Sequence, residues 1–376
     1  MTRRLTDLAE AEERREAVRR AAADYLKGEW SLAQLRECVE QGGVADAPEL
    51  WSGMQRLDWD QVEPFRAGDD SGTPAELAFG LEEFCALVDE VGQALAPTPL
   101  VPSVVGRAVL RATGTAITAS LPVVAHAEGD RSTNRLRTSV HAKPTPAGYR
   151  LDGAKRFVPY GLQADLVIVN AAQHDGACGL FAIDLQTPGI ERTALALLDS
   201  SPCAELKMDG VEVPREARIA SGDAAMRLLR DALAVETLAR CAELVGVASR
   251  ALDLAVEYAK QRIAFDRPIG SFQAVQHKLV DLRGHVEVSR ALYQGAAAAV
   301  PDQSAERDVA VAMAAFAALD DLRKVPEGAL QIFGGIGTTW EHDIHFFVRR
   351  AATLCALLGE RSGFREIVAN HLASES

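Results

Sequence analysis

The stretch YAKQRIAFDRPIGSFQAVQHKLVDL, from Tyr258 to Leu282, marks the end of the longest helical pattern in the sequence. The Ala/Leu/Val-rich segment before it, Ala225–Gln261, contains no proline, and a second helical pattern begins at Phe272. Proline and glycine residues separate the two patterns, and both residue types break helices. The stretch therefore predicts two long helices with a short irregular connection between them.

Hydrophobic periodicity divides the whole chain into three regions. Residues 1–115 carry helical patterns, residues 116–222 carry short runs that alternate with a period of two, and residues 223–376 are helical again. The short runs include Ala116–Ser120, Gly148–Leu151, Leu166–Val169, Gly179–Asp184 and Ala204–Met208. We expect an α+β fold with an N-terminal α-helical domain, a central antiparallel β-sheet domain and a C-terminal α-helical bundle.

The composition of the 376 residues fits a soluble globular protein, since 48% are hydrophobic and 25% are charged. A formal net charge of −13 argues against a nucleic-acid partner, because phosphate backbones bind to clustered basic surfaces. No apolar run approaches the roughly 20 residues that span a membrane, and the N-terminus has no apolar signal core. The 6 cysteines form no CxxC pair, which is typical of free thiols in a reducing compartment. We therefore expect a cytoplasmic protein.

Two motifs in the C-terminal region combine residues that suit a phosphate-bearing ligand. Arg262 precedes Phe265 by three residues, and a guanidinium group matches phosphate oxygens bidentately. The second motif, QIFGGIG at Gln331–Gly337, places Gly334 and Gly335 where the backbone can turn sharply and offer N–H groups to a ligand. Each motif also has a structural alternative, because an arginine stabilises a helix C-terminus and a glycine pair often ends a helix.

With these spacings the two motifs resemble the C-terminal domain of the acyl-CoA dehydrogenase family, which is a four-helix bundle. The resemblance implies a flavin dinucleotide, FAD, that lies across a subunit interface. It assigns the cofactor contacts to Arg262, Phe265, Gln273, Gln331, Gly334 and Gly335. Asp266 departs from the family pattern, which has glycine at this position, and its carboxylate would repel a pyrophosphate.

The reaction that the resemblance implies is the oxidation of an acyl-CoA thioester at its α and β carbons. A glutamate removes the α proton, and a buried carboxylate suits this role because burial raises its pKa. The usual place of that glutamate falls at Leu358, beside Gly359, and neither residue can accept a proton. A minority of family members carry the base on the long helix, where ungapped counting back from Phe265 leads to Glu236. Glu236 also lies four residues before Arg240, so a helical ion pair is its structural alternative.

The central region lacks other parts of the family pattern. In family members, a Thr- or Ser-bearing turn within the stretch that corresponds to LDGAKRFVPYGLQADLVIV, Leu151–Val169, touches the flavin ring. Phe157, Pro159 and Tyr160 occupy those places in this chain. The chain therefore keeps the motifs that hold the dinucleotide and lacks the expected ring contacts and the usual base.

The stretch WEHDIHFF, Trp340–Phe347, resembles actinobacterial members that act on steroid or other bulky acyl-CoA thioesters, several of which pair two different chains around one flavin. We predict one subunit of a heterotetrameric acyl-CoA dehydrogenase that binds FAD and an acyl-CoA substrate and delivers electrons to an acceptor such as an electron-transfer flavoprotein. The alternatives are a homotetrameric dehydrogenase with Glu236 as its base, and a flavin-free structural or regulatory protein. His342 and His345 are three residues apart, but no carboxylate–histidine set completes a metal site around them.

Overall fold

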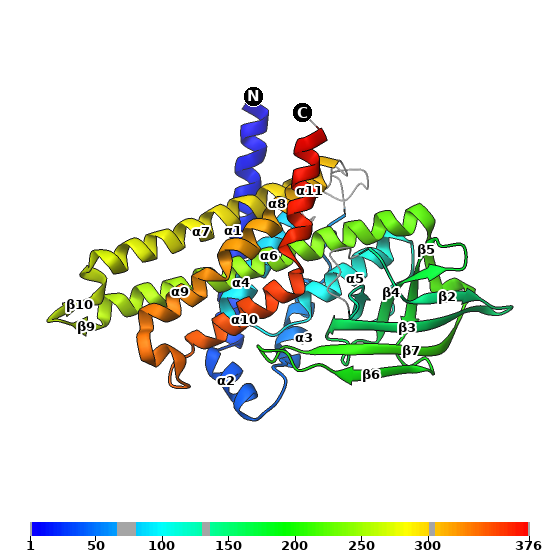
Figure 1. The fold of residues 1–376 in the computed structure, drawn as a ribbon, viewed down its shortest axis with the longest axis horizontal. Helices are drawn as coiled ribbons and strands as arrows, with labels where there is room; N and C mark the ends of the chain where they lie inside the picture. Colours follow the sequence, from blue (N-terminus) through cyan, green and yellow to red (C-terminus); the bar gives the residue numbers. More distant parts are fainter. Residues whose placement is uncertain (1, 66–79, 130–135, 301–304, 375–376) are drawn as a thin grey trace. The chain divides into compact units, whose positions relative to one another are not determined.

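The computed structural model of the chain describes residues 2–65, 80–129, 136–300 and 305–374 (Figure 1). The chain forms two compact units. The helical unit comprises Met1–Gly43, Phe79–Ala96 and Thr237–Ser376, and the sheet unit comprises Val44–Ala78 and Pro97–Glu236. The long helix α6, Gly222–Gln261, belongs to both units because the division falls within it. The expected division into three domains, at residues 115 and 222, stays a prediction.

The helical unit is held together by a buried carboxylate as well as by apolar side chains. Asp89 on α4 (Leu81–Ala94) is fully buried. It accepts hydrogen bonds from Arg19 on α1 (Thr2–Glu29) at 3.0 Å and from Tyr293 on α7 (Gln273–Ala299) at 3.1 Å. These bonds satisfy a charge that is costly to bury alone, and they join three helices. The unit also contains α2 (Leu32–Glu40), α8 (Ala305–Ala317), a π turn (Ala318–Leu322), α9 (Lys324–Phe333), α10 (Ile344–Leu358) and α11 (Arg361–Ser374).

Helices α4 and α6 cross at two glycines. A Cβ atom built on Gly92 would lie 2.2 Å from the carbonyl oxygen of Glu243, and one built on Gly246 would lie 1.9 Å from the carbonyl oxygen of Asp89. Cβ atoms do not approach backbone oxygens this closely, so only glycine permits the contact at either position. Gly246 therefore has a packing role that outweighs its poor helix propensity.

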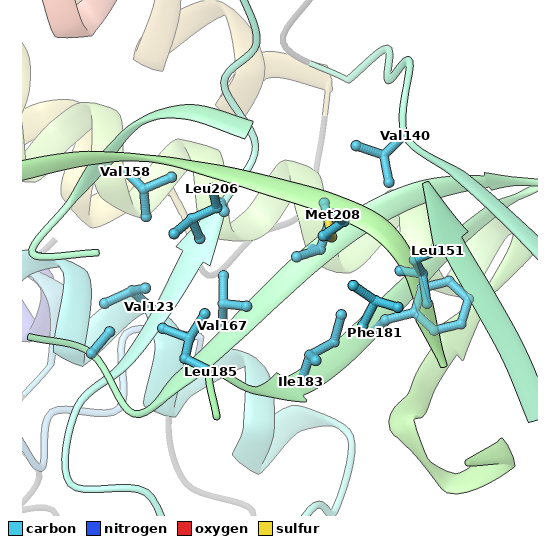
Figure 2. Close-up of a cluster of buried hydrophobic side chains, with 14 of the residues drawn as sticks. Val123, Val140, Leu151, Val158, Val167, Phe181, Ile183, Leu185, Leu206 and Met208 are labelled. Atoms are coloured by element: carbon cyan, nitrogen blue, oxygen red, sulfur yellow. The ribbon is translucent and has the colours of Figure 1, made fainter. Parts of the chain in front are cut away.

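The sheet unit is built around one 8-stranded sheet with the order β6-β7-β3-β2-β4-β5-β8, while β1 pairs with β4 outside this path. Its apolar side chains gather in a core to which Val123, Leu151, Val167, Phe181 and Leu206 contribute from five different strands (Figure 2). The strands are β1 (Pro122–Ala125), β2 (His141–Pro144), β3 (Gly148–Pro159), β4 (Leu166–Gln173), β5 (Cys178–Asp184), β6 (Ile190–Ala194), β7 (Cys203–Pro214) and β8 (Arg218–Ser221), and the helices of this unit are α3 (Pro48–Arg56) and α5 (Leu100–Ala112).

The α+β class is confirmed, with helices before and after a central sheet in the chain order. The sheet itself is mixed rather than wholly antiparallel, because both β1 and β2 pair with β4 in the parallel direction. The expected strand at Ala116–Ser120 was wrong: this run is irregular, and the first strand begins at Pro122. The other four short runs all lie within strands. None of the described helices combines the length and apolar composition that crossing a membrane needs.

Candidate functional site

The connection between α6 and α7 is a short hairpin. Strands β9 (Ile263–Ala264) and β10 (Arg267–Pro268) pair in the antiparallel direction, and Phe265 and Asp266 form the tip. Both tip residues have positive φ angles, 52° and 63°. Hairpins with two-residue tips favour this left-handed backbone, which glycine and aspartate tolerate and which strains a bulky residue. Asp266 therefore meets the same conformational demand as the glycine that the family pattern places here.

The hairpin presents its functional side chains to solvent. Phe265 is 89% exposed, and Arg262 is also exposed. The Phe265 ring meets Phe272 edge-on at 6.1 Å, and the guanidinium of Arg267 lies 4.1 Å from the Phe272 ring centroid. The sequence interpretation overlooked Arg267, although its position next to Pro268 at the end of the hairpin was a usable signal. The hairpin thus offers two guanidinium groups beside an exposed aromatic ring.

The glycine motif lies near the same end of α6. Helix α9 ends at Phe333, whose ring lies 4.5 Å from that of Tyr258, one turn before Arg262. The following 3₁₀ turn, Gly334–Thr338, starts with a positive φ of 65° at Gly334. A Cβ atom built on Gly334 or on Gly335 would meet nothing within 4 Å, so the backbone of both residues is open to a ligand. These two glycines are exposed.

The six predicted cofactor residues thus all belong to the helical unit, and all are exposed. We call them, together with Arg267, the hairpin surface: Arg262, Phe265, Arg267, Gln273, Gln331, Gly334 and Gly335. Its chemistry fits a flavin dinucleotide, because guanidinium groups bind pyrophosphate, an exposed aromatic ring packs on planar groups, and glycine N–H groups and glutamine amides bind polar edges. Arg262, Arg267 and the glycine backbone would hold the phosphates and polar edges of that cofactor.

The predicted base, Glu236, lies on α6, 26 positions before Arg262 in the sequence. It is buried, with 8% of its surface exposed, and it belongs to the sheet unit. Its Oε2 lies 2.8 Å from Nε2 of His126, a residue of the loop that follows β1. The imidazole is also buried, with 9% of its side chain exposed. The structure therefore joins two titratable groups that are 110 residues apart in the sequence.

A buried lysine fixes the loop that carries His126. Lys155 Nζ donates to Glu128 Oε1 at 2.5 Å, Asn170 Oδ1 at 2.8 Å and Thr138 Oγ1 at 3.0 Å. Burial disfavours the charge on Glu128, but the hydrogen bonds from Lys155, Ser139 and Thr138 outweigh it and lower the pKa of that carboxyl to about 2. Burial lowers the pKa of Lys155, and its bonds to Glu128 offset only part of this effect. Glu128 therefore forms an ion pair with the buried Lys155.

The three residues that replace the family's hydroxyl-bearing turn lie at the end of β3. The register of β3 against β7 shifts between Lys155 and Val158, and Phe157 within this irregularity has a positive φ of 54°. Phe157 is 39% exposed, with the guanidinium of Arg156 5.5 Å from its ring centroid. Tyr160 instead is buried in the apolar core of the sheet unit. The irregular backbone thus turns one aromatic side chain outward and the other inward.

The remaining candidates lie in the helical unit. Leu358, at the usual place of the base, is fully buried at the end of α10, and Gly359 follows with a φ of 103°. Nδ1 of His342 accepts a hydrogen bond from the backbone N–H of Ile344 at 3.1 Å. Neither observation supplies a proton acceptor at the expected place. In the part of the chain that the structure describes, His, Cys, Asp and Glu side chains form no group of three that could hold a metal ion.

Comparisons with known proteins find similarity to the family that the two motifs resemble. Residues 226–373 match the family model "Acyl-CoA dehydrogenase, C-terminal domain". The chain is 35% identical over 238 residues to the acyl-CoA dehydrogenase FadE27 of Mycobacterium tuberculosis, a match that covers 61% of this chain. The chain spans 62% of the length of FadE27, and between 35% and 64% of the length of five further curated relatives that are 30–44% identical to it.

Two solved structures share the fold over nearly the full length. A structure of the ChsE4–ChsE5 complex from Mycobacterium tuberculosis is 26% identical and has a TM-score of 0.83, and the match covers 96% of this chain and 97% of that one. The Tcur3481–Tcur3483 steroid ACAD G363A variant is 27% identical and also has a TM-score of 0.83, and its match covers 97% of this chain and 99% of that one. Both of these structures contain two different named subunits.

Proposed function

Since the chain belongs to the acyl-CoA dehydrogenase family, we propose that it takes part in the α,β-desaturation of an acyl-CoA thioester with FAD as the hydride acceptor, as one subunit of a heteromeric complex. In this role the hairpin surface holds a flavin dinucleotide whose ring lies in the partner subunit. The partner supplies the ring contacts and the base. FAD, when bound, supplies the electron-accepting ring.

The observation that carries this proposal is the exposure of the hairpin surface in a single chain. Phe265 is 89% exposed, and the arginines beside it are exposed too. Exposed aromatic and arginine side chains are typical of surfaces that become buried on assembly or ligand binding.

The relatives suggest the kind of substrate and partner. The two solved structures are each named for two different subunits, and one of them is described as a steroid ACAD. We infer a bulky or steroid acyl-CoA thioester as the substrate of the complex, and a second acyl-CoA dehydrogenase subunit as the partner. An electron-transfer flavoprotein would then accept the electrons.

One observation favours a second candidate function, a homotetrameric dehydrogenase that uses Glu236 as its own base. Glu236 is buried next to the imidazole of His126, so it has the low solvent exposure and the polar partner that a catalytic carboxylate needs. In this alternative the hairpin surface of one copy would hold the flavin of another copy.

The test is to purify the chain alone, and to purify it after co-expression with a dehydrogenase subunit that is encoded by a neighbouring gene. The flavin absorbance spectrum and the native mass of each product are then measured. We expect a colourless or flavin-poor chain that acquires stoichiometric FAD only in a mixed assembly. Stoichiometric FAD on an assembly of this chain alone would overturn the heteromeric proposal and support the homotetramer. A mixed assembly without flavin would contradict both.

A further inference from the structure

The pair of His126 and Glu236 points to a role that the hairpin surface does not supply. On α6, the helical turn that precedes Glu236 carries the buried apolar side chains of Ala232 and Leu233. A carboxylate in such surroundings requires a hydrogen-bond donor. Oε2 of Glu236 lies 2.8 Å from Nε2 of His126, a ring nitrogen that donates a hydrogen bond when it carries the imidazole proton.

The loop that carries His126 is fixed on both sides of the imidazole. Ala125, before it, pairs with Val169 in the sheet, and the carbonyl oxygen of Ala127, after it, accepts a hydrogen bond from the backbone N–H of Arg156 at 2.9 Å. The next residue, Glu128, is bonded to Lys155. The backbone on either side therefore holds the imidazole in place, and the nearest acidic neighbour in the loop has its own cation. A group held in this way is preorganised for its contact with Glu236.

We propose that His126 is a positioning residue for Glu236, and that it donates its Nε2 proton to one carboxylate oxygen and fixes the orientation of the carboxylate as a base. This inference rests on the second candidate function, in which Glu236 is the base. An ionised carboxylate has about four lone-pair sites, so the hydrogen bond from His126 would occupy only one of them. When the α C–H bond of the thioester breaks, the proton passes to Glu236, which becomes a neutral acid. FAD, when bound, would supply the acceptor for the β hydrogen and its electron pair, and His126 would keep its own proton throughout.

The first test needs neither flavin nor substrate. In the purified chain labelled with ¹⁵N-histidine, the NMR signal that disappears in His126→Gln identifies His126. We expect its Nε2 signal in the protonated range, and we expect Glu236→Gln to move this signal. Glu191→Gln, which changes an exposed glutamate on β6 of the same unit, is the matched control and should leave the signal unchanged. An unprotonated Nε2, or a signal that Glu236→Gln does not move, would overturn the proposal.

The second test uses the flavin-loaded assembly with octanoyl-CoA and cholyl-CoA as probe substrates. His126→Leu removes the donor, and we expect kcat to fall about ten- to a hundredfold with little change in KM, which corresponds to the loss of one hydrogen bond to a charged group. His126→Gln retains an N–H donor and should recover most of the lost kcat. Equal kcat values for His126→Leu and the unchanged chain would contradict a positioning role. If Glu236→Gln leaves turnover intact, the proposal for the base fails, while the NMR signal still decides whether the pair exists.

Discussion

At Lys155, a positive charge lies inside the sheet unit with none of its side chain exposed. Its ammonium group is satisfied by Glu128, Asn170 and Thr138, so the charge is tolerated because every donor position has an acceptor nearby. Removing one member of such a buried pair leaves the other without compensation, whereas removing both is far milder.

We therefore expect Lys155→Met to lower the free energy of unfolding by about 3–5 kcal/mol, because Glu128 loses its cation. The double variant Lys155→Met with Glu128→Gln should recover a substantial part of this loss. Urea unfolding of the purified chain at neutral pH measures both. A single variant that costs less than about 1 kcal/mol would show that the pair contributes no more than a surface ion pair does.

The residues of the candidate site differ in how well the sequence predicts them. Arg262 and Glu236 were predicted from the family resemblance, which matches the Arg262–Phe265 motif and counts back along the sequence to Glu236. His126 could not be predicted, because its contact with Glu236 joins residues 110 positions apart and depends on how β1 and its loop fold. The tolerance of Asp266 also required the backbone, since only the φ of 63° explains why an aspartate can replace glycine there.

Among the elements, the crossing of α4 and α6 depends on glycine. We expect Gly246→Ala to destabilise the chain by about 1–3 kcal/mol despite the better helix propensity of alanine, because the new methyl group would overlap the carbonyl oxygen of Asp89. Gly284→Ala on α7 is the matched control, since a Cβ atom there meets nothing within 4 Å. That substitution should stabilise the chain by up to about 1 kcal/mol. Thermal unfolding of the two variants compares them, and equal effects would contradict the close crossing.

The sequence predicts helices of this chain better than it predicts the sheet. The predicted helix Ala225–Gln261 differs from α6 only at its first few residues, because a long apolar segment without proline leaves few alternatives. The run Ala116–Ser120 has a period of two and still forms no strand. Whether such a run joins a sheet is decided by partners elsewhere in the chain, and Pro122–Ala125 finds its partner in β4, more than forty residues later.

At the scale of the whole molecule, the hairpin surface is exposed, so we expect substitutions there to affect assembly without affecting folding. We expect Phe265→Asp and Arg262→Glu to leave the unfolding curve of the isolated chain within about 0.5 kcal/mol, because neither side chain is packed in the chain's interior. Both should greatly reduce the flavin content of the assembly. Circular dichroism and flavin absorbance measure the two effects. The control is Leu198→Asp, which changes an equally apolar side chain that is 61% exposed in the sheet unit. If all three variants retained flavin, the assignment of the hairpin surface to flavin binding would be contradicted.

Helix α6 runs without interruption from Gly222 to Gln261, and it leads directly into the hairpin. Each residue of an α-helix adds a turn of about 100° and a rise of about 1.5 Å. A single inserted codon between Glu236 and Arg262 would therefore swing the hairpin to a different side of the helix axis, while most single substitutions would leave its direction unchanged. We therefore expect an insertion in this segment of α6 to be more harmful than most single substitutions in it.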